Sequence, residues 1–282
     1  MLKVQPKPET YEGQTLNQWL NYRKPGETPH VLSLKEKVDK TIELLKRLDI
    51  DGCITGSCML EDFDPDGWGT TPDVDIFVYG EQELQHAIDV LTMQLRMEPG
   101  TGTARSREQE EWKLNQLRTD GINRKAVVCT HKFFTDGVIV NVTYKREKVQ
   151  GHWLPIRDAT SVLRSFDMSI VMQAYDIKSH ILFDMRVGDP KVAVPNPLRD
   201  HGCMMWNVAK WVRQFDRVVK YYGRGYDTRP MAKFYLDMID QCINAGCLFD
   251  SEESREYFDS MTVEFREKRA DIKAWLDEHE ED

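Results

Sequence analysis

The sequence predicts an α/β fold, an α+β arrangement in which a mixed sheet is flanked by helices and followed by a helical C-terminal domain. Three observations predict it. In residues 73–79, the aliphatic side chains at 74, 76 and 78 alternate with Asp73, Asp75 and Phe77, as in a half-buried strand. Ser33 stands three residues before Glu36, a capping box that opens an amphipathic helix. From residue 199 onward, apolar residues recur at helical spacing.

These patterns divide the chain into three parts. Residues 1–32 contain four prolines among polar residues and are expected to form an extended arm with a short helical piece near 16–22. Residues 33–198 are the predicted α/β core. Residues 199–282 are the predicted helical domain, with a basic first helix and an acidic tail.

Within the core, hydrophobic periodicity and turn residues place each element in order. We expect a helix at 33–48, a strand around Ile54, a Gly-Ser turn opening a short helix, a strand at 73–79, a helix at 82–97, strands at 126–130 and 138–144, a helix at 155–163, and a hairpin formed by 165–175 and 180–185. The C-terminal domain is expected to contain helices at 201–222, 230–244 and 251–276.

The net charge of −9 is unevenly distributed. Residues 250–282 contain 13 acidic and 5 basic residues, so about one net negative charge remains for the rest of the chain. A polyanionic ligand elsewhere is therefore compatible with the composition. No apolar run approaches the roughly 20 residues of a membrane helix, and the N-terminus lacks a secretion signal. We expect a cytoplasmic protein without a membrane partner, whose six scattered cysteines are reduced thiols.

Two aspartates share one face of the strand at 73–79. Asp73 and Asp75 alternate with Val74 and Ile76, and successive side chains of a strand point to opposite faces. Two carboxylates about 5 Å apart repel by roughly 3 kcal/mol at an effective dielectric constant near 20. A divalent cation removes this cost, and Mg²⁺ prefers carboxylate and phosphate oxygens. The pair predicts a metal site, although such pairs also occur on solvated strand edges.

A glycine and a serine precede this strand. Gly56 lets the backbone approach a phosphate closely, and Ser57 offers a hydroxyl and an N–H at the start of a helix. Gly-Ser followed by Asp-x-Asp on a strand resembles the signature of the polymerase-beta-type nucleotidyltransferase superfamily. The 15 residues between Ser57 and Asp73 are slightly more than is usual there, and we interpret residues 64–72 as an inserted loop.

The resemblance implies a nucleotidyltransferase fold, a cofactor and a reaction. Asp73 and Asp75 would chelate Mg²⁺, two ions in an active enzyme and one in a degenerate member. Gly56 and Ser57 would hold the phosphates of a nucleoside triphosphate, expected to be ATP. A hydroxyl of an RNA end, a protein or a small molecule would attack the α-phosphorus, and pyrophosphate would leave.

Family members carry a third carboxylate on a neighbouring strand, where this chain has Asn141. An amide brings no charge and cannot take a proton, so acceptor activation should be poor. Asp136 and Asp167 are the carboxylates that could substitute, although Asp167 could equally cap a backbone N–H. The alternative to a transferase is therefore a degenerate member that binds nucleotides or nucleic acid and acts in regulation.

The first helix of the C-terminal domain carries a basic ridge. Between residues 199 and 233 there are 8 basic and 3 acidic residues, with tyrosines interleaved, a pattern suited to phosphates and unpaired bases. The same pattern also describes an ordinary charged helix surface. A basic-aromatic segment also follows the core of members encoded by large viruses and phages, which this chain resembles; a viral protein would act in the host cytoplasm. We expect Lys220 and Arg224 to contact the nucleotide. We expect Lys210, Arg213 and Arg217 to contact nucleic acid.

Overall fold

The computed structural model describes residues 2–4, 15–22, 31–99, 128–149, 152–199, 214–244 and 252–280. Its internal contacts divide the chain into two units. The first unit comprises Met1–Ser165 and Val171–Met185, and the second comprises Phe166–Ile170 and Arg186–Asp282. The predicted mixed α/β class is confirmed, whereas the three predicted domains remain a prediction.

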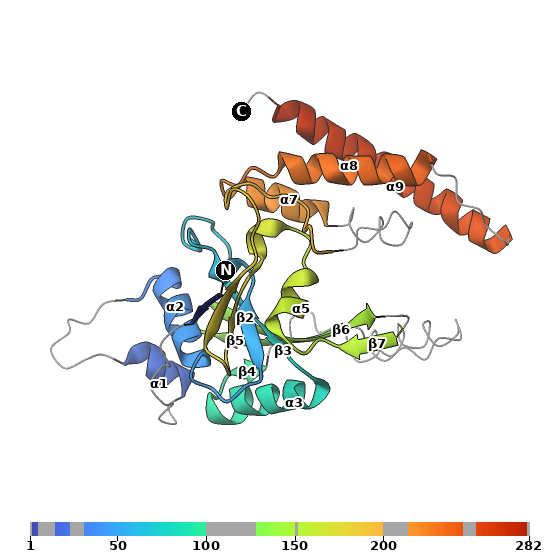
Figure 1. Cartoon of the computed structure of the whole chain (residues 1–282). Helices are drawn as coiled ribbons and strands as arrows, with labels where there is room; N and C mark the ends of the chain where they lie inside the picture. Colours follow the sequence, from blue (N-terminus) through green and yellow to red (C-terminus); the bar gives the residue numbers. More distant parts are fainter. Residues whose placement is uncertain are drawn as a thin grey trace. The chain divides into compact units, whose positions relative to one another are not determined.

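In the first unit, nine strands of the described residues join one sheet (Figure 1). Across the sheet the order is β1-β9-β8-β2-β3-β6-β5-β4, and β7 pairs with β6. The strands are β1 (Leu2–Val4), β2 (Gly52–Thr55), β3 (Asp73–Val78), β4 (Glu98–Pro99), β5 (Val128–Thr135), β6 (Val138–Val149), β7 (His152–Pro155), β8 (Gln173–Asp176) and β9 (Ile181–Asp184).

One pair of neighbouring strands makes the sheet mixed. β3 and β6 run parallel, with Asp75 opposite Asn141, whereas β3 and β2 run antiparallel, with Asp75 opposite Thr55. The other strand pairs are antiparallel too. A parallel pair needs a crossover connection, and the residues between β3 and β6 supply it. β3 is thus held on both sides, which fixes the direction of its side chains.

Helices of the first unit pack on this sheet. They are α1 (Leu16–Asn21), α2 (Leu34–Leu45), α3 (Glu81–Asp89), which continues into a π-helical turn at Val90–Gln94, and α5 (Ala159–Arg164). α2 and α3 both contact β3 and β6, and α5 contacts β8. The predicted capping box is present, because the Ser33 hydroxyl accepts from the Glu36 N–H while the Glu36 carboxylate accepts from the Ser33 N–H.

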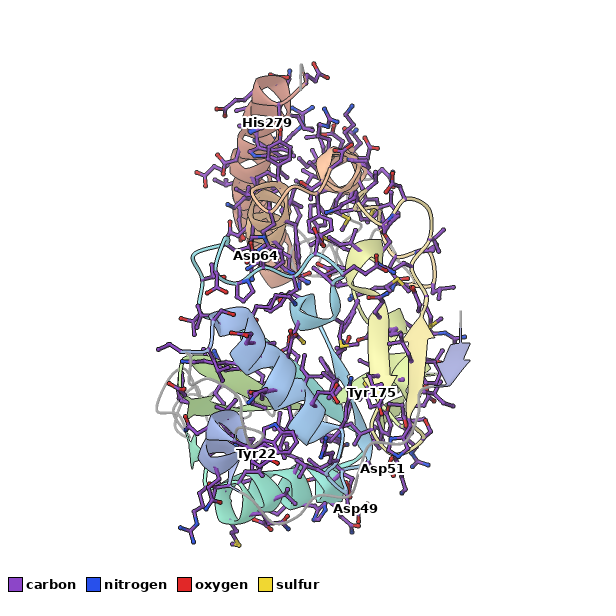
Figure 2. All side chains as sticks on the ribbon, turned by 90° about the vertical axis from the view of Figure 1, so that its left-hand side faces the viewer. Tyr22, Asp49, Asp51, Asp64, Tyr175 and His279 are labelled. Atoms are coloured by element: carbon purple, nitrogen blue, oxygen red, sulfur yellow. The ribbon has the colours of Figure 1, made fainter. Side chains whose placement is uncertain are left out.

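The segments before and after β2 lie at opposite ends of the first unit. Asp49 and Asp51 precede β2 and lie at one end, whereas Asp64, in the loop after β2, lies at the other (Figure 2). The Asp66 carboxylate of this loop accepts hydrogen bonds from the Leu34 and Lys35 N–H groups at the start of α2. The loop is therefore anchored to a helix end, where free N–H groups need acceptors.

Two expected elements differ from the structure. The predicted hairpin is present as β8 and β9, but Ser165–Val171 is not a strand, and Ser169–Val171 forms a 3-10 helix. The physical reason is that the backbone of 167–169 bonds to 194–196: the Ser169 N–H donates to the Val194 carbonyl and the Asn196 N–H to the Asp167 carbonyl. The predicted helix at 155–163 begins only at Ala159, since Asp158 caps it and 152–155 form β7.

The described part of the second unit consists mainly of helices, with non-helical segments at 166–168, 186–199 and 223–228. Its helices are α7 (Phe215–Tyr222), α8 (Arg229–Asn244) and α9 (Glu252–Glu278), close to the predicted bounds. The first part of the predicted helix at 201–222 lies outside the described residues up to 213. Among the helices that are described, none has both the length and the apolar character needed to cross a membrane.

Candidate metal and nucleotide site

Asp73 and Asp75 lie on one face of β3, as the alternation predicts. Both residues are partly exposed. Val74, which lies between them, and Ile76, which follows Asp75, are 0% exposed and face the core. Burial of these apolar side chains fixes the register, since a shift by one residue would turn the carboxylates inward. The sheet therefore presents the two aspartates side by side.

Asn141 brings the two carboxylates to one point. Its Nδ2 donates to Asp75 Oδ1 at 2.8 Å and lies 3.4 Å from Asp73 Oδ2. The parallel register of β3 and β6 sets Asn141 opposite Asp75, and the side chain is 8% exposed. Its other amide atom, Oδ1, is buried and has no hydrogen-bond partner in the part of the chain that the structure describes. The site thus contains four carboxylate oxygens and one unsatisfied amide oxygen.

Gly56 closes the site at the end of β2. Its φ of +91° is unfavourable for residues with a side chain, and a Cβ built on it would lie 2.4 Å from Asp75 Oδ2. Glycine is therefore required here by backbone conformation and by the close approach of the aspartate. The prediction that the Gly-Ser turn lies against the aspartate pair holds for Gly56, and this contact is the reason for the glycine.

Ser57 begins a shorter element than predicted. In place of the expected helix, the structure has a 3-10 turn at Ser57–Met59. The Leu60 N–H donates to the Ser57 carbonyl, and the chain then continues into the loop. A turn of three residues lacks the aligned N–H groups of an α-helix, so an anion site built on a helix N-terminus is not formed here. The Ser57 side chain is 7% exposed, and its role as a phosphate contact remains a prediction.

Cys58 lies beside the aspartates but does not resemble a metal ligand. Its thiol is buried and donates to the Thr55 carbonyl at 3.3 Å. Burial raises the pKa of this thiol, and the charges of Asp75 and Asp73 raise it further. A metal ligand would need to be a thiolate, so Cys58 packs as a neutral side chain.

The donor set fits a hard cation such as Mg²⁺. In the described part of the chain no three or more His, Cys, Asp or Glu side chains gather in a way that could hold a metal ion. The site at Asp73 and Asp75 instead combines two carboxylates with an amide, and oxygen ligands of this kind suit Mg²⁺, which retains waters and phosphate oxygens. Rotation of the Asn141 amide would turn the unsatisfied Oδ1 toward such an ion.

Asp136 and Asp167, the predicted substitutes for a third carboxylate, make other contacts. Asp136 lies in the turn between β5 and β6, where its carboxylate is 3.1 Å from Lys37 Nζ. Asp167 belongs to the second unit and accepts from Arg217 Nη1 at 2.6 Å. A guanidinium so close opposes cation binding at that carboxylate.

The predicted basic residues of the C-terminal domain divide into three cases. Arg217 directs a guanidinium nitrogen to Asp167 rather than outward. Lys220 is exposed on α7, and the Arg224 guanidinium lies 5.5 Å from the centre of the Tyr221 ring. Lys210 and Arg213 lie outside the described residues. The nucleotide and nucleic-acid roles of these residues remain predictions.

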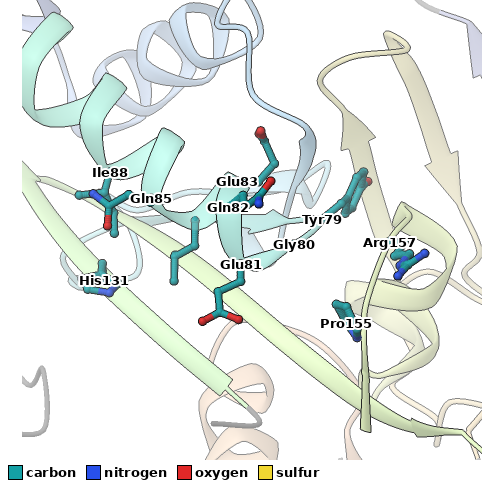
Figure 3. Close-up of a pocket in the computed structure, with 11 residues that line it drawn as sticks. Tyr79, Gly80, Glu81, Gln82, Glu83, Gln85, Ile88, His131, Pro155 and Arg157 are labelled. Carbon is teal, nitrogen blue, oxygen red and sulfur yellow. The ribbon is translucent and has the colours of Figure 1, made fainter. Parts of the chain in front are cut away.

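A pocket of about 910 Å³ lies at the other end of β3 (Figure 3). It is lined by the start of α3 together with side chains that include Tyr79, Glu81, Glu83, His131 and Arg157. Tyr79 stands six residues after Asp73, which corresponds to about 20 Å along a strand. The pocket contains none of the predicted site residues, and no sequence pattern indicated it.

Comparisons of the chain with protein-family models, with curated proteins and with solved structures gave no match.

Proposed function

We propose that the first unit has a nucleotidyltransferase-type fold and that the protein is a Mg²⁺-dependent nucleotidyltransferase using a nucleoside triphosphate, expected to be ATP. The observation that supports this best is the meeting of the Asp73 and Asp75 carboxylates at one amide nitrogen of Asn141. The contact of Gly56 with Asp75 adds the Gly-Ser part of the signature at the same place.

Each residue has a defined task in this proposal. Asp73 and Asp75 bind Mg²⁺, which when bound neutralises charge on the phosphate oxygens. Gly56 leaves room for the Asp75 carboxylate, and Gly56 and Ser57 hold the phosphates, Ser57 through its hydroxyl. The acceptor hydroxyl, on RNA, on protein or on a small molecule, forms the new bond to the α-phosphorus as the bond to pyrophosphate breaks, and its proton passes to solvent water because Asn141 cannot accept it. Positioning and charge neutralisation supply most of the rate.

A second candidate function rests on Asn141. Its amide cannot accept the proton of the attacking hydroxyl, and its Nδ2 occupies the space between the two carboxylates. A protein that binds Mg²⁺ and a nucleotide without transferring it, and that acts as a binding or regulatory protein, would need nothing more. This candidate shares the site and differs only in turnover.

One experiment separates the two. The protein is incubated with Mg²⁺ and each nucleoside triphosphate labelled at the α-phosphorus, in the presence of RNA, and both bound and covalently transferred label are measured. The Asp73→Asn/Asp75→Asn variant keeps side-chain shape and removes both charges. Asp39→Asn, an exposed position on α2, is the matched control.

The outcomes are distinct. Transferred label in the wild type and in the control, but not in the double variant, supports the transferase. Label that is bound but never transferred, and lost in the double variant, supports the binding protein. Label bound equally by all three proteins, or by none, contradicts both candidates.

A further inference from the structure

A second group of buried polar side chains lies within the second unit. Asp167 is 1% exposed and accepts from Arg217 Nη1 at 2.6 Å. Tyr235, on α8, is 0% exposed. After burial, which raises the pKa of the Tyr235 hydroxyl most, the charges of Asp167 and Arg217 also act on this pKa, so the three groups lie within electrostatic range of one another. We call Asp167, Arg199, Arg217 and Tyr235 the Asp167 cluster.

Two atoms of this cluster are unsatisfied. Asp167 Oδ2 and the Tyr235 hydroxyl are buried and have no hydrogen-bond partner among the described residues. More than nine in ten buried polar groups in proteins do have one, and a buried carboxylate oxygen without a donor is especially unfavourable. Such atoms often mark the place of a bound water, ion or ligand. Asp167 Oδ2 needs a hydrogen-bond donor, and the Tyr235 hydroxyl can donate to an acceptor.

Local structure holds the cluster in place from three segments. Asn196 is 0% exposed; its N–H donates to the Asp167 carbonyl at 2.9 Å and its Nδ2 to the Phe166 carbonyl at 3.0 Å. The Arg199 N–H donates to the Asn196 carbonyl at 3.2 Å, so the backbone of Arg199 is tied to the residue whose own N–H bonds to Asp167. α7 contributes Arg217 and α8 contributes Tyr235, so the arrangement is not the accident of one flexible loop.

The charges of the cluster favour an anion. Burial lowers the pKa of Arg199, the negative charge of Asp167 opposes that shift, and the positive charge of Arg217 adds to it. Two guanidinium groups thus lie within electrostatic reach of each other and of the same carboxylate. Burial also raises the pKa of Tyr235, so its hydroxyl stays protonated and able to donate. Arginine forks and a hydroxyl are donors typical of phosphate recognition.

We propose that the Asp167 cluster binds a phosphate group that keeps a P–OH, either singly or doubly charged inorganic phosphate or a singly charged phosphomonoester. Arg199, Arg217 and the Tyr235 hydroxyl donate to the unprotonated phosphate oxygens. Asp167 Oδ2 accepts from the remaining P–OH, which satisfies both orphaned atoms at once. Sulfate at neutral pH carries no O–H and would leave Asp167 Oδ2 facing another negative oxygen. The site therefore selects phosphate over sulfate.

This proposal stands apart from the proposed function, because it uses residues of the second unit alone. Its failure would leave the metal site untouched, and the reverse holds as well. The Asp73→Asn/Asp75→Asn variant makes the distinction practical: it should lose Mg²⁺-nucleotide binding and keep the phosphate response described next.

The test is a thermal-melting titration of the full chain near pH 6.5 with inorganic phosphate, glycerol 3-phosphate and sulfate at equal ionic strength. A ligand that binds only the folded state raises the melting temperature in proportion to the logarithm of its concentration above Kd. We expect a rise of about 3 °C or more with phosphate and little with sulfate, which also controls for general salt effects. A response to glycerol 3-phosphate as well would assign a phosphomonoester, and its absence a free phosphate.

Variants test the named atoms. Tyr235→Phe removes only the hydroxyl and should weaken phosphate binding about tenfold, measured directly by calorimetry, while Tyr222→Phe on α7, outside the cluster, should not. Asp167→Asn supplies an N–H donor and should reduce the preference for phosphate over sulfate. Equal responses to phosphate and sulfate, an unchanged response in Tyr235→Phe, or loss of the response in Asp73→Asn/Asp75→Asn would overturn the proposal. A buried water in place of the anion would give no response and overturn it too.

Discussion

The aspartate pair on β3 and the Asp167 cluster are both built around carboxylates, yet their neighbours differ in sign. Asp73 and Asp75 meet a neutral amide and each other. Asp167 meets the guanidinium of Arg217 and is almost wholly buried. The first arrangement has an excess of acceptors and suits a cation, whereas the second has charged donors and suits an anion. The contrast teaches that an aspartate's function is set by what the fold brings beside it.

The largest expected effect comes from removing the positively charged side chain that pairs with Asp167. Arg217→Ala leaves a carboxylate that is 1% exposed without its partner, which should cost about 3 to 5 kcal/mol of unfolding free energy. Urea denaturation measures it. Arg269→Ala is the matched control, because Arg269 pairs with the more exposed Asp240, and its loss should be much smaller. Similar losses for the two variants would contradict the buried role of the Arg217 pair.

A second test adds a charge to the aspartate pair. Asn141→Asp places a third carboxylate within about 5 Å of two others, each of which repels it by about 3 kcal/mol. Because the new carboxyl group can take up a proton instead, the loss of stability at neutral pH without a divalent cation should be limited to about 4 kcal/mol. Added Mg²⁺ should restore stability, and by more than it stabilises the wild type. Melting curves with Mg²⁺ and with a chelator check this. Gln94→Glu, at an exposed position, should change neither curve.

A third test changes the backbone beside Asp75. Gly56→Ala combines an unfavourable φ of +91° with a Cβ 2.4 Å from Asp75 Oδ2, so it should cost about 2 kcal/mol and weaken Mg²⁺-nucleotide binding about tenfold or more. Gly69→Ala has a similar φ of +60° with nothing within 4 Å. It should show the backbone cost of about 1 kcal/mol and unchanged binding. Equal binding by the two variants would mean that Asp75 is not part of the site.

The smallest test concerns the buried thiol of Cys53, whose pKa is raised mainly by burial and further by the negative charges of Asp176 and Asp158. Burial raises the pKa of the Cys53 thiol to about 12, well above its value in an unfolded chain. Only the unfolded state then loses this proton as the pH rises above about 9, so unfolding free energy should fall by about 1 kcal/mol per pH unit until the folded pKa is reached. At lower pH the contribution is fully present. Cys53→Ala should fall less steeply over pH 9–11 than the wild type, and parallel curves would rule this out.

Local patterns predicted much of the fold. The Ser33–Glu36 capping box, the alternation of β3 and the helical periodicity near the C-terminus depend on neighbours in sequence, and the helices and strands follow them. The strand prediction for the segment at 165–171 was wrong, because the structure of this segment depends on residues distant in sequence. Its apolar residues resemble a strand, but its backbone hydrogen bonds go to 194–196, a pairing that no local pattern encodes.

The candidate site was predictable in part. Alternation placed Asp73 and Asp75 on one face, whereas Asn141 was identified through the family resemblance, as the residue at the place of the third carboxylate, and the register of β3 and β6 sets it opposite Asp75. The length of the element after Ser57 was not predictable, because the chain leaves it early for a loop whose Asp66 carboxylate bonds to the start of α2. Tyr235 and Arg199 were missed altogether. Each resembles an ordinary residue of an amphipathic segment or loop, and only tertiary packing gathers them around Asp167.

The parallel pairing of β3 with β6 has a consequence for how the protein matures. Asp75 and Asn141 are separated by 66 positions in the chain and meet only across this pair. A nascent polypeptide that ends before Val138 already contains both aspartates and Gly56, yet it lacks the strand that brings the amide between them. Closing so long a loop is a late and entropically expensive step. Competence to bind a cation should therefore arise abruptly, when β6 docks, rather than grow with chain length.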